Sequence, residues 1–396
     1  MDRRQFLNRS VLAPVAAYAA QGSGMANSGG QGGPGKVTLR EKFFGCIAAC
    51  HVGSALGAPC EGWTWQEIQD KRGTIDKLWP YQHYRNGWDR EPGTTEDGVE
   101  RQKLMITAII EKQDRVTAED VRKIWVRDMK AEQAGMISEP FEGVLLAMAK
   151  SGIPACDIGR YCDYAGLNSM SRACHAIPLI NAGDIEHAVA DVFEVGQLYQ
   201  TTNSRGLQWA AMMGIAIASA TKPGATVDSV IADILQGDPR WNVKGEKGHP
   251  EIRAEIERAL KVTQGCKDFK ELRVAMEALY SGKGTPYAFA SASEVVTKGI
   301  CIFYLTKGHT KDTMIAAVNM GRDTDCLTAV SSGIAGALSG ASSIPEEWIK
   351  QVDYATTKMP VTNNRRTIRQ CADGLYEAYR ARLGRTKAFA AEMEQA

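Results

Sequence analysis

Helical periodicity runs through almost every segment of the chain after Lys36, and this restricts the folds that the sequence can adopt. Between residues 225 and 235, for example, Val227, Ile231 and Ile234 fall on one face of a helix. No segment shows the sustained alternation of polar and apolar residues that indicates a half-buried strand. Proline and glycine separate the helical runs at intervals. The pattern therefore predicts an all-α protein.

Two of the helical runs, residues 206–220 and 327–338, are rich in Ala, Gly and Ser. Small side chains let helices approach one another closely, so we expect both runs near the centre of a large bundle. The least regular interior stretch, residues 237–250, is either a linker between two domains or a surface loop. We favour a surface loop and predict a single domain over residues 36–396.

Residues 1–35 differ in composition and are predicted to be an export signal followed by a flexible linker. The segment around Arg3 and Arg4 resembles a twin-arginine signal, with a weakly apolar stretch at residues 11–20 and a candidate cleavage site at residues 17–19. This predicts a periplasmic or secreted protein that the twin-arginine export machinery delivers folded. The alternative is a disordered basic N-terminus. Ten residues are too few to span a bilayer, and we expect no membrane span elsewhere.

Charge and cysteine usage exclude several classes of protein. The chain has 47 Lys and Arg against 46 Asp and Glu and a net charge of +1, so we expect no binding to nucleic acid or to an anionic membrane. The cysteines lack the spacing of a zinc site. Cys46 and Cys50 lie one helical turn apart in an apolar run, and Cys301 lies in another. We expect mostly free, buried thiols.

Two short acidic clusters, Thr95-Glu96-Asp97 and Asp323-Thr324-Asp325, stand far apart in the sequence. Each holds two carboxylates within three residues, which like-charge repulsion disfavours unless a cation lies between them. Hard divalent cations prefer such oxygen ligands, and two ions about 3.5–4 Å apart form a common hydrolytic arrangement. The alternative is that both clusters are ordinary helix N-caps. We favour a shared metal site, which requires one domain to bring the clusters together.

Four segments carry a resemblance to a known family. Residues 321–326 read Gly-Arg-Asp-Thr-Asp-Cys and precede a small-residue helix, and Thr95-Glu96-Asp97 forms the second acidic segment. Residues 51–62 contain Ser-Ala-Leu-Gly and a glutamate, and residues 166–172 run from Gly to Met-Ser-Arg. In this order, the segments resemble the motifs Gly-Gly-Asp-Thr-Asp-Thr, Thr-Asp-Asp, Gly-Asp-Ala-Leu-Gly and Gly-Asn-Gly-Ser of the ADP-ribosylglycohydrolase family. The resemblance extends from about residue 36 to at least residue 382.

The resemblance implies a compact orthogonal multi-helix bundle and a hydrolase that cleaves a glycosidic bond at the anomeric carbon of a ribose-like sugar. It also implies two Mg²⁺ ions, for which Mn²⁺ could substitute. Glu61 and Asp97 are the implied catalytic residues, and the alternative for Glu61 is a loop or N-cap glutamate. The implied metal ligands are Thr95, Glu96, Asp97, Asp323 and Asp325.

Substrate contacts are expected from a further set of residues. His83 lies within residues 79–93, which crowd aromatic, Arg and His side chains directly before the first acidic cluster. This stretch is either a loop that faces the substrate or a loop whose aromatic rings pack on the bundle. We expect His51, in an apolar helix, to be a core residue. The complete substrate-binding set comprises His83, Ser169, Arg172, His175, Gln200, Gly321 and Arg322.

Several positions depart from the family pattern. Glu96 replaces an aspartate, Gly98 replaces a threonine, and Leu167 and Asn168 replace Asn-Gly. Gln200 stands where many relatives have a histidine that faces the substrate. Cys326 stands in place of a threonine hydroxyl that often helps to bind the second metal, and a thiol is a poorer ligand for a hard cation. The metal chemistry is therefore the firmer expectation and the substrate the weaker one.

Together these features predict a metal-dependent glycosidase that acts outside the cytoplasm on a nucleoside, an N-glycoside or a furanoside. The export signal argues against the usual substrates of the family, because ADP-ribosylated proteins arise where NAD is abundant, inside the cell. One alternative is a non-catalytic sugar- or nucleotide-binding protein on a degenerate metal site. Another is a two-metal phosphoesterase.

Overall fold

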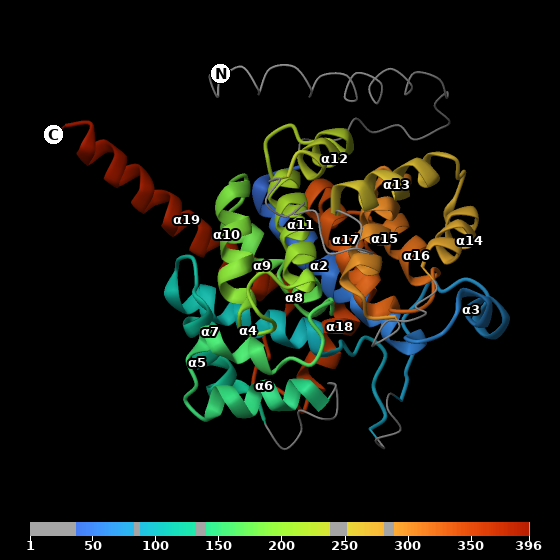
Figure 1. The fold of residues 1–396 in the computed structure, drawn as a ribbon, viewed down its shortest axis with the longest axis horizontal. Coiled ribbons are helices and arrows are strands. Elements are labelled where there is room, and N and C mark those ends of the chain that lie inside the picture. Colours follow the sequence, from blue (N-terminus) through green and yellow to red (C-terminus); the bar gives the residue numbers. More distant parts are fainter. Residues whose placement is uncertain (1–36, 83–87, 131–139, 238–251, 281–288, 396) are drawn as a thin grey trace, which may run out of the picture. The chain divides into compact units, whose positions relative to one another are not determined.

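Helices provide the regular secondary structure in the part of the chain that the computed structural model describes, residues 37–82, 88–130, 140–237, 252–280 and 289–395. These residues contain 18 α-helices and no β-strand, which confirms the all-α prediction (Figure 1). Residues 38–396 group into one unit. The predicted leader lies outside the described residues, as does the predicted surface loop apart from Gly237.

The helices follow one another along the chain with short connections. They are α2 (Leu39–Gly57), α3 (Trp65–Arg72), α4 (Asp97–Lys112), α5 (Ala118–Asp128), α6 (Pro140–Lys150), α7 (Ala155–Ile158), α8 (Ser169–Ala173), α9 (Ala176–Ile180), α10 (Ile185–Gly196), α11 (Arg205–Ala220), α12 (Val227–Leu235), α13 (Ile252–Gln264), α14 (Phe269–Leu279), α15 (Ala292–Leu305), α16 (Thr310–Val318), α17 (Thr324–Ser339), α18 (Glu346–Lys358) and α19 (Ile368–Met393), with the 3₁₀ turns η1 (Ala58–Cys60) and η3 (Gly159–Tyr161).

Local sequence signals explain where many of these helices begin. At α2, the Thr38 hydroxyl accepts from the backbone N–H of Glu41 at 3.2 Å, and the Glu41 carboxylate accepts from the backbone N–H of Thr38 at 2.7 Å. This reciprocal pair satisfies two N–H groups that the first turn of a helix leaves without a partner. The helices α3, α5, α12 and α19 begin with the same kind of box.

The helices α2 and α17 form a closely packed antiparallel pair at the centre of the bundle (Figure 1). A Cβ atom on Gly45 would come within 2.3 Å of the backbone of Gly336, and one on Gly57 within 2.3 Å of Thr324. The Thr324 hydroxyl also donates to the Gly57 carbonyl at 2.8 Å. The small residues of α17 therefore lie where the sequence predicted, and the start of α17 is fixed beside the end of α2.

The helix α2 corrects one expectation from the sequence. The segment Leu39–Cys60 is long and apolar enough, by length and composition, to cross a membrane, whereas we had expected no such segment. In the structure, 89% of its most apolar window is buried inside the protein. Its apolar character is accounted for by its position at the core of the bundle.

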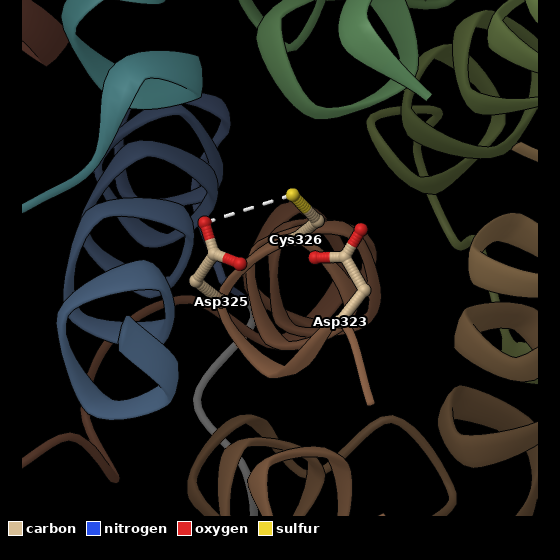
Figure 2. A group of neighbouring side chains, drawn as sticks. All are labelled: Asp323, Asp325 and Cys326. Atoms are coloured by element: carbon tan, nitrogen blue, oxygen red, sulfur yellow. Dashed lines mark hydrogen bonds between the residues drawn. The ribbon is translucent and has the colours of Figure 1, made fainter. Parts of the chain in front are cut away.

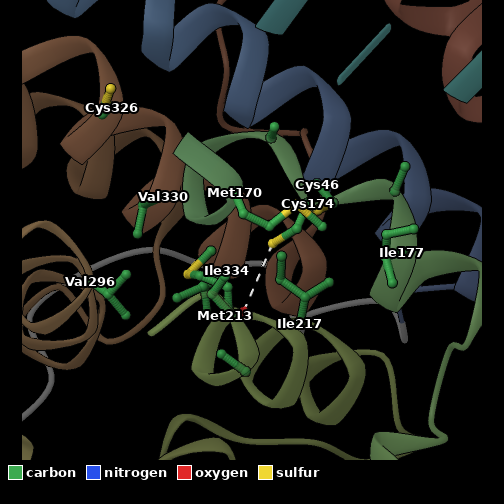
Figure 3. Close-up of a cluster of buried hydrophobic side chains, with 14 of the residues drawn as sticks. Cys46, Met170, Cys174, Ile177, Met213, Ile217, Val296, Cys326, Val330 and Ile334 are labelled. Carbon is green, nitrogen blue, oxygen red and sulfur yellow. Dashed lines mark hydrogen bonds between the residues drawn. The ribbon is translucent and has the colours of Figure 1, made fainter. Parts of the chain in front are cut away.

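Buried apolar side chains and thiols fill the space between α8, α9, α11, α15 and α17 (Figure 3). Cys174 lies beside Cys46 and Met170, and Cys326 lies at the margin of this cluster, one turn before Val330 in α17 (Figure 3). All ten cysteines are free thiols, and seven of them, Cys46, Cys50, Cys60, Cys174, Cys301, Cys326 and Cys371, are buried. The apolar core therefore extends directly to the first turn of α17, where the second acidic cluster lies.

Candidate metal centre

Both acidic clusters lie at the N-terminal ends of helices. Glu96 is the N-cap residue of α4 and Asp323 is the N-cap residue of α17, yet neither side chain accepts a capping hydrogen bond from a backbone N–H of its own helix. The positive end of a helix dipole favours a nearby carboxylate but does not by itself hold its oxygens. The alternative of ordinary N-caps is therefore wrong for these two side chains, which turn toward other groups.

The first turn of α17 gathers two carboxylates and a thiol. Potential ligand atoms of Asp323, Asp325 and Cys326 lie within 4.8 Å of one another, and all three residues are buried (Figure 2). Asn168 donates through Nδ2 to Oδ2 of Asp323 at 2.7 Å. The Oδ1 atoms of Asp323 and Asp325 are buried and, when both carboxylates are ionised, accept no hydrogen bond from a donor among the described residues; a proton shared between the two carboxyls would link them. Two carboxylate oxygens are therefore positioned to accept a ligand.

Burial makes it unfavourable for these carboxylates to carry a charge. It raises the pKa of Asp323 to about 6, with the Glu61 carboxylate adding to the effect. It raises the pKa of Asp325 well above its usual range, with the neighbouring Asp323 as the next cause. Burial also raises the pKa of Cys326, so its thiol stays protonated and is a poor ligand for a hard cation. A divalent cation would relieve the repulsion between the two carboxylates.

The acidic cluster Thr95-Glu96-Asp97, at the start of α4, already has partners within the protein. Arg90 forms a buried ion pair with Glu96, with Nε 3.3 Å from Oε1. The Tyr81 hydroxyl donates to the same oxygen at 2.5 Å. The Thr95 hydroxyl donates to Glu100 at 3.0 Å. The structure therefore ties the predicted ligands Thr95 and Glu96 to protein groups.

Arg172 joins the two clusters. Its Nη2 atom bonds Oδ2 of Asp97, and its Nη1 atom donates to Sγ of Cys326 at 3.5 Å. Because α8 carries Arg172 near its end and has Asn168 as its N-cap residue, this short helix contacts both acidic clusters. The two clusters, which are more than 220 residues apart in sequence, thus lie in one site.

Glu61 lies beside this site on the segment that follows η1. It is half-buried, and its charge is close enough to raise the pKa of Asp323. Two backbone hydrogen bonds tie its segment to the α17 entrance: Gly62 N–H donates to the Arg322 carbonyl at 2.8 Å, and Arg322 N–H donates to the Trp63 carbonyl at 2.6 Å. Glu61 is therefore held at the border of the acidic cluster.

Glycohydrolase relatives share both this fold and its sequence pattern. The family model of ADP-ribosylglycohydrolases matches residues 35–384. The chain belongs to the ADP-ribosylglycohydrolase family. This confirms the resemblance inferred from the motifs. A solved structure described as an ADP-ribosylglycohydrolase-related protein complex superposes with a TM-score of 0.58 at 15% identity, covering 86% of this chain and 99% of that one, and so shares the fold.

Two similar proteins come from a bacterium and an archaeon. The uncharacterized protein YegU of Escherichia coli K12 is 23% identical over 314 residues, which cover 77% of this chain and 89% of YegU. An uncharacterized protein of Archaeoglobus fulgidus is 22% identical over 347 residues, which cover 86% of this chain and 98% of that protein. Members of the ADP-ribosylglycohydrolase family are typically metal-dependent hydrolases. Membership therefore supports a glycohydrolase-like function.

The metal that the family implies fits the residues of this site. Asp323 and Asp325 each present a buried oxygen that receives no hydrogen bond from the residues that the structure describes, and Asp97 lies near enough to influence the pKa of Asp325. Carboxylate oxygens are the preferred ligands of hard divalent cations. These three residues would hold a metal in this family member, with Asn168 orienting Asp323.

The structure brings only some of the predicted substrate-binding residues to the acidic cluster. Arg172 reaches it, and Ser169 is buried at the start of α8. Gly321 has a φ of 75° and packs so closely on the segment 63–65 that a Cβ atom would come within 2.5 Å of the Trp65 nitrogen. Gly321 therefore has a clear structural role in placing the α17 entrance.

Three other predicted residues turn elsewhere, and a fourth is not described. The Arg322 guanidinium pairs with Glu294 at 2.5 and 2.9 Å. His175 is buried with Nε2 3.1 Å from the Ala329 carbonyl, and burial lowers its pKa to about 4. Gln200 donates to the backbone carbonyls of the 164–167 turn. His83 lies outside the described residues. Substrate contact by these four side chains stays a prediction.

Sequence reasoning missed Asn168, Tyr81 and Arg90. Asn168 was treated only as a departure from the family pattern, although an amide next to a binding segment is a reasonable partner for a carboxylate. Tyr81 and Arg90 pair through their backbones, at 3.2 and 2.9 Å, and direct their side chains to Glu96. Trp88 instead packs on the bundle. Trp88 thus agrees with the packing interpretation of residues 79–93, whereas a substrate-facing role for this stretch stays a prediction.

The histidine His51 agrees with its prediction as a core residue. Its ring is buried, and Nε2 lies 2.9 Å from Oε1 of Gln102. Burial lowers the pKa of this histidine well below its usual range, so the ring is neutral.

Proposed function

We propose that this protein hydrolyses a glycosidic bond to a ribose-like sugar with the help of a divalent cation, Mg²⁺ or Mn²⁺. The observation that carries the proposal is the pair of buried oxygens of Asp323 and Asp325 that accept no hydrogen bond from the described part of the chain, in a member of a glycohydrolase family. Such a pair of buried acidic groups is costly in a fold unless it binds a cation. In the two-ion form expected from the sequence, Thr95 and Glu96 would complete the ligand set.

Each residue of the site has a role that follows from its position. A bound divalent cation would orient sugar hydroxyls and stabilise negative charge that develops on oxygen. Asn168 holds Asp323 in one orientation by its hydrogen bond. Glu61, half-buried at the border of the cluster, is positioned to exchange a proton with the leaving group or with the attacking water. Asp97 completes the acidic surface from the side of α4.

The test is turnover on two classes of substrate with Mg²⁺ or Mn²⁺ added. Release of the aglycone from an aryl ribofuranoside, or release of ADP-ribose from ADP-ribosylated arginine, with loss of activity in EDTA, would support the proposal. Release of phosphate from phosphate esters without glycoside cleavage would support a phosphoesterase instead. No turnover with either metal on any of these substrates would contradict the proposal.

We further propose that the substrate is an extracytoplasmic nucleoside, N-glycoside or furanoside. The support is the leader sequence, in which Arg3 and Arg4 precede a weakly apolar stretch. Replacing both arginines with lysine should retain the precursor inside the cell. Fractionation that finds the unaltered protein entirely in the cytoplasm would remove this reason for doubting an ADP-ribosylated protein as substrate.

A second candidate function is non-catalytic binding of a sugar or nucleotide. Two observations favour it: Glu96 is engaged by Arg90, and Cys326 presents a protonated thiol to the site. Under this alternative, a sugar library would give ligands that raise the melting temperature in the presence of metal without being cleaved. Measured turnover excludes it.

A further inference from the structure

We infer that Arg172 is a resident cation of the acidic site, and that this chain therefore binds one divalent ion where the two-ion form would hold two. The inference rests on the proposed function and concerns the same site. Arg172 is almost completely buried, with 8% of its side chain exposed, and it lies between the two acidic clusters. A guanidinium is always charged in a protein, so it acts as a permanent positive group.

The backbone next to Asp97 leaves room for the Arg172 side chain. A Cβ atom on Gly98 would come within 2.8 Å of both Cγ and Cδ of Arg172. Contacts below 3.0 Å require something to move, so any other residue at position 98 would push the arginine away from its place. Gly98 therefore leaves the space in which the Arg172 stem runs.

The charges of the three buried aspartates balance with one added ion, and Glu61 is left out of this count because it is only half-buried at the border of the site, where solvent screens its charge. Asp97, Asp323 and Asp325 carry three negative charges when ionised. Arg172 supplies one positive charge, and a single divalent cation supplies the remaining two. A second divalent cation would leave two uncompensated positive charges in a buried site, which is strongly unfavourable.

The other acidic residues near α4 do not change this balance, because each has its own cation. Glu96 pairs with Arg90, with both side chains buried. Glu100 pairs with Lys103 at 2.7 Å, again with both side chains buried. Two of the carboxylates closest to Thr95 are thus already neutralised within the fold.

Cys326 fits the same arrangement. Its sulfur accepts a hydrogen bond from Arg172 at 3.5 Å, and its thiol donates to Oδ2 of Asp325 at 3.6 Å. The thiol thereby links the resident cation to the carboxylate at the opposite side of the site. Cys326 can therefore belong to the site without being a metal ligand.

The experiment measures how many Mn²⁺ ions each full-length chain binds. After treatment with EDTA, the protein is equilibrated with Mn²⁺ by dialysis, bound metal is counted by elemental analysis, and the electron paramagnetic resonance spectrum is recorded. We expect one ion per chain and the spectrum of an isolated Mn²⁺. Two ions per chain with the spectrum of a magnetically coupled pair would overturn the inference and leave the proposed function standing. No bound Mn²⁺ at millimolar concentration would overturn both.

Two variants and a matched control extend the test. Removing the positive charge by Arg172→Gln should raise the count from one ion to two, and Gly98→Ala, which displaces the same side chain, should act in the same direction. Arg322→Gln removes the same charge from the residue directly before Asp323, where the guanidinium faces Glu294, and should leave the count at one. A count of one in the folded Arg172→Gln variant would overturn the inference. The count for the unaltered protein decides the question even where neither variant folds.

Discussion

The two acidic helix starts of this molecule differ in how far the protein itself compensates their charge. At the start of α4, Glu96 has Arg90 as a buried partner and Asp97 has Arg172. At the start of α17, Asp323 receives a hydrogen bond from the neutral amide of Asn168. The first helix start is balanced by cations of the chain, whereas the second depends more on a cation from solution.

This difference indicates that the two acidic clusters, which look alike in the sequence, have different roles in the structure. The carboxylates of α4 belong to a network that holds Tyr81 and Arg90 on one side and Arg172 of α8 on the other. The carboxylates of α17 keep two oxygens without hydrogen-bond partners among the described residues. Such buried polar atoms are rare in folded proteins and call for a ligand or a functional role. We therefore regard α17 as the metal-binding side of the site.

The largest effect is expected from Asp325→Ala. This variant should lose measurable Mn²⁺ binding and all metal-dependent turnover while keeping its helical circular dichroism, because it removes a principal ligand. Glu96→Gln should change metal affinity by less than about threefold, since Glu96 faces Arg90 and not the open oxygens. Isothermal titration calorimetry measures both.

The control for that comparison is Asp228→Ala, which removes an exposed carboxylate from the first turn of α12. It should bind Mn²⁺ as the unaltered protein does. If Glu96→Gln were to abolish binding as completely as Asp325→Ala, the contrast between the two helix starts would be wrong. If Asp325→Ala kept its full affinity, the metal site itself would be wrong.

Glu61→Gln should act on chemistry more than on binding. An interaction made mainly in the transition state lowers kcat without raising KM, and a proton-transferring carboxylate contributes about 10²- to 10⁴-fold. We expect kcat on the best glycoside to fall within that range, with Mn²⁺ affinity nearly unchanged because Glu61 only borders the cluster. Steady-state kinetics together with calorimetry check this. A variant with full kcat would remove Glu61 from the mechanism.

Asn168→Ala should weaken metal binding less than loss of a ligand does. The amide holds Asp323 by one hydrogen bond of 2.7 Å, and groups that orient a ligand typically contribute about 10- to 100-fold in affinity. Asn168→Asp adds a negative charge beside Asp323 and is a useful comparison at the same position. An affinity unchanged by Asn168→Ala would show that Asp323 needs no support from α8.

Much of the architecture could be predicted from the sequence because it depends on local patterns. Apolar periodicity and reciprocal caps such as Thr38 with Glu41 are readable within a few residues, and small residues marked α17 as a central helix. The acidic pairs were also visible. The partners that distinguish the two acidic pairs could not be predicted from local patterns, since Asn168 lies 155 positions from Asp323 in sequence.

The direction of a side chain is the other property that the pattern did not provide. Gln200, by its resemblance to a family position, and His175 are both predicted to contact substrate, and both turn to backbone carbonyls inside the bundle. A motif position states which residue type recurs there, whereas the packing of neighbouring helices decides where its side chain points. Arg172 differs from these two residues. It is also predicted to contact substrate, and its side chain does reach the acidic site, where it faces Asp97 and Cys326.

The smallest expected effect concerns stability, and it has opposite signs at the two helix starts. In EDTA at pH 7, Asp325→Asn should raise the melting temperature, because a carboxyl whose pKa is raised in the folded protein destabilises the fold at any pH at which the same carboxyl is ionised in the unfolded chain. Asp97→Asn should lower it, since Arg172 then loses a charged partner in a buried position. Each change should amount to about 1 kcal/mol in the free energy of unfolding.

The pH dependence follows from the same raised pKa values. Asp325 takes up its proton well above the usual range of an aspartate, and Asp323 takes up its own as the pH falls through about 6, so the advantage of Asp325→Asn over the unaltered protein should shrink as the pH falls toward the usual pKa of an aspartate. Saturating Mn²⁺ should reverse the order at pH 7, because ligand binding stabilises only the protein that retains the site. Differential scanning fluorimetry across pH, with and without Mn²⁺, measures all of these shifts. Equal destabilisation by both substitutions in EDTA would mean that the α17 carboxylates are satisfied by the protein alone, and the contrast between the two helix starts would then disappear.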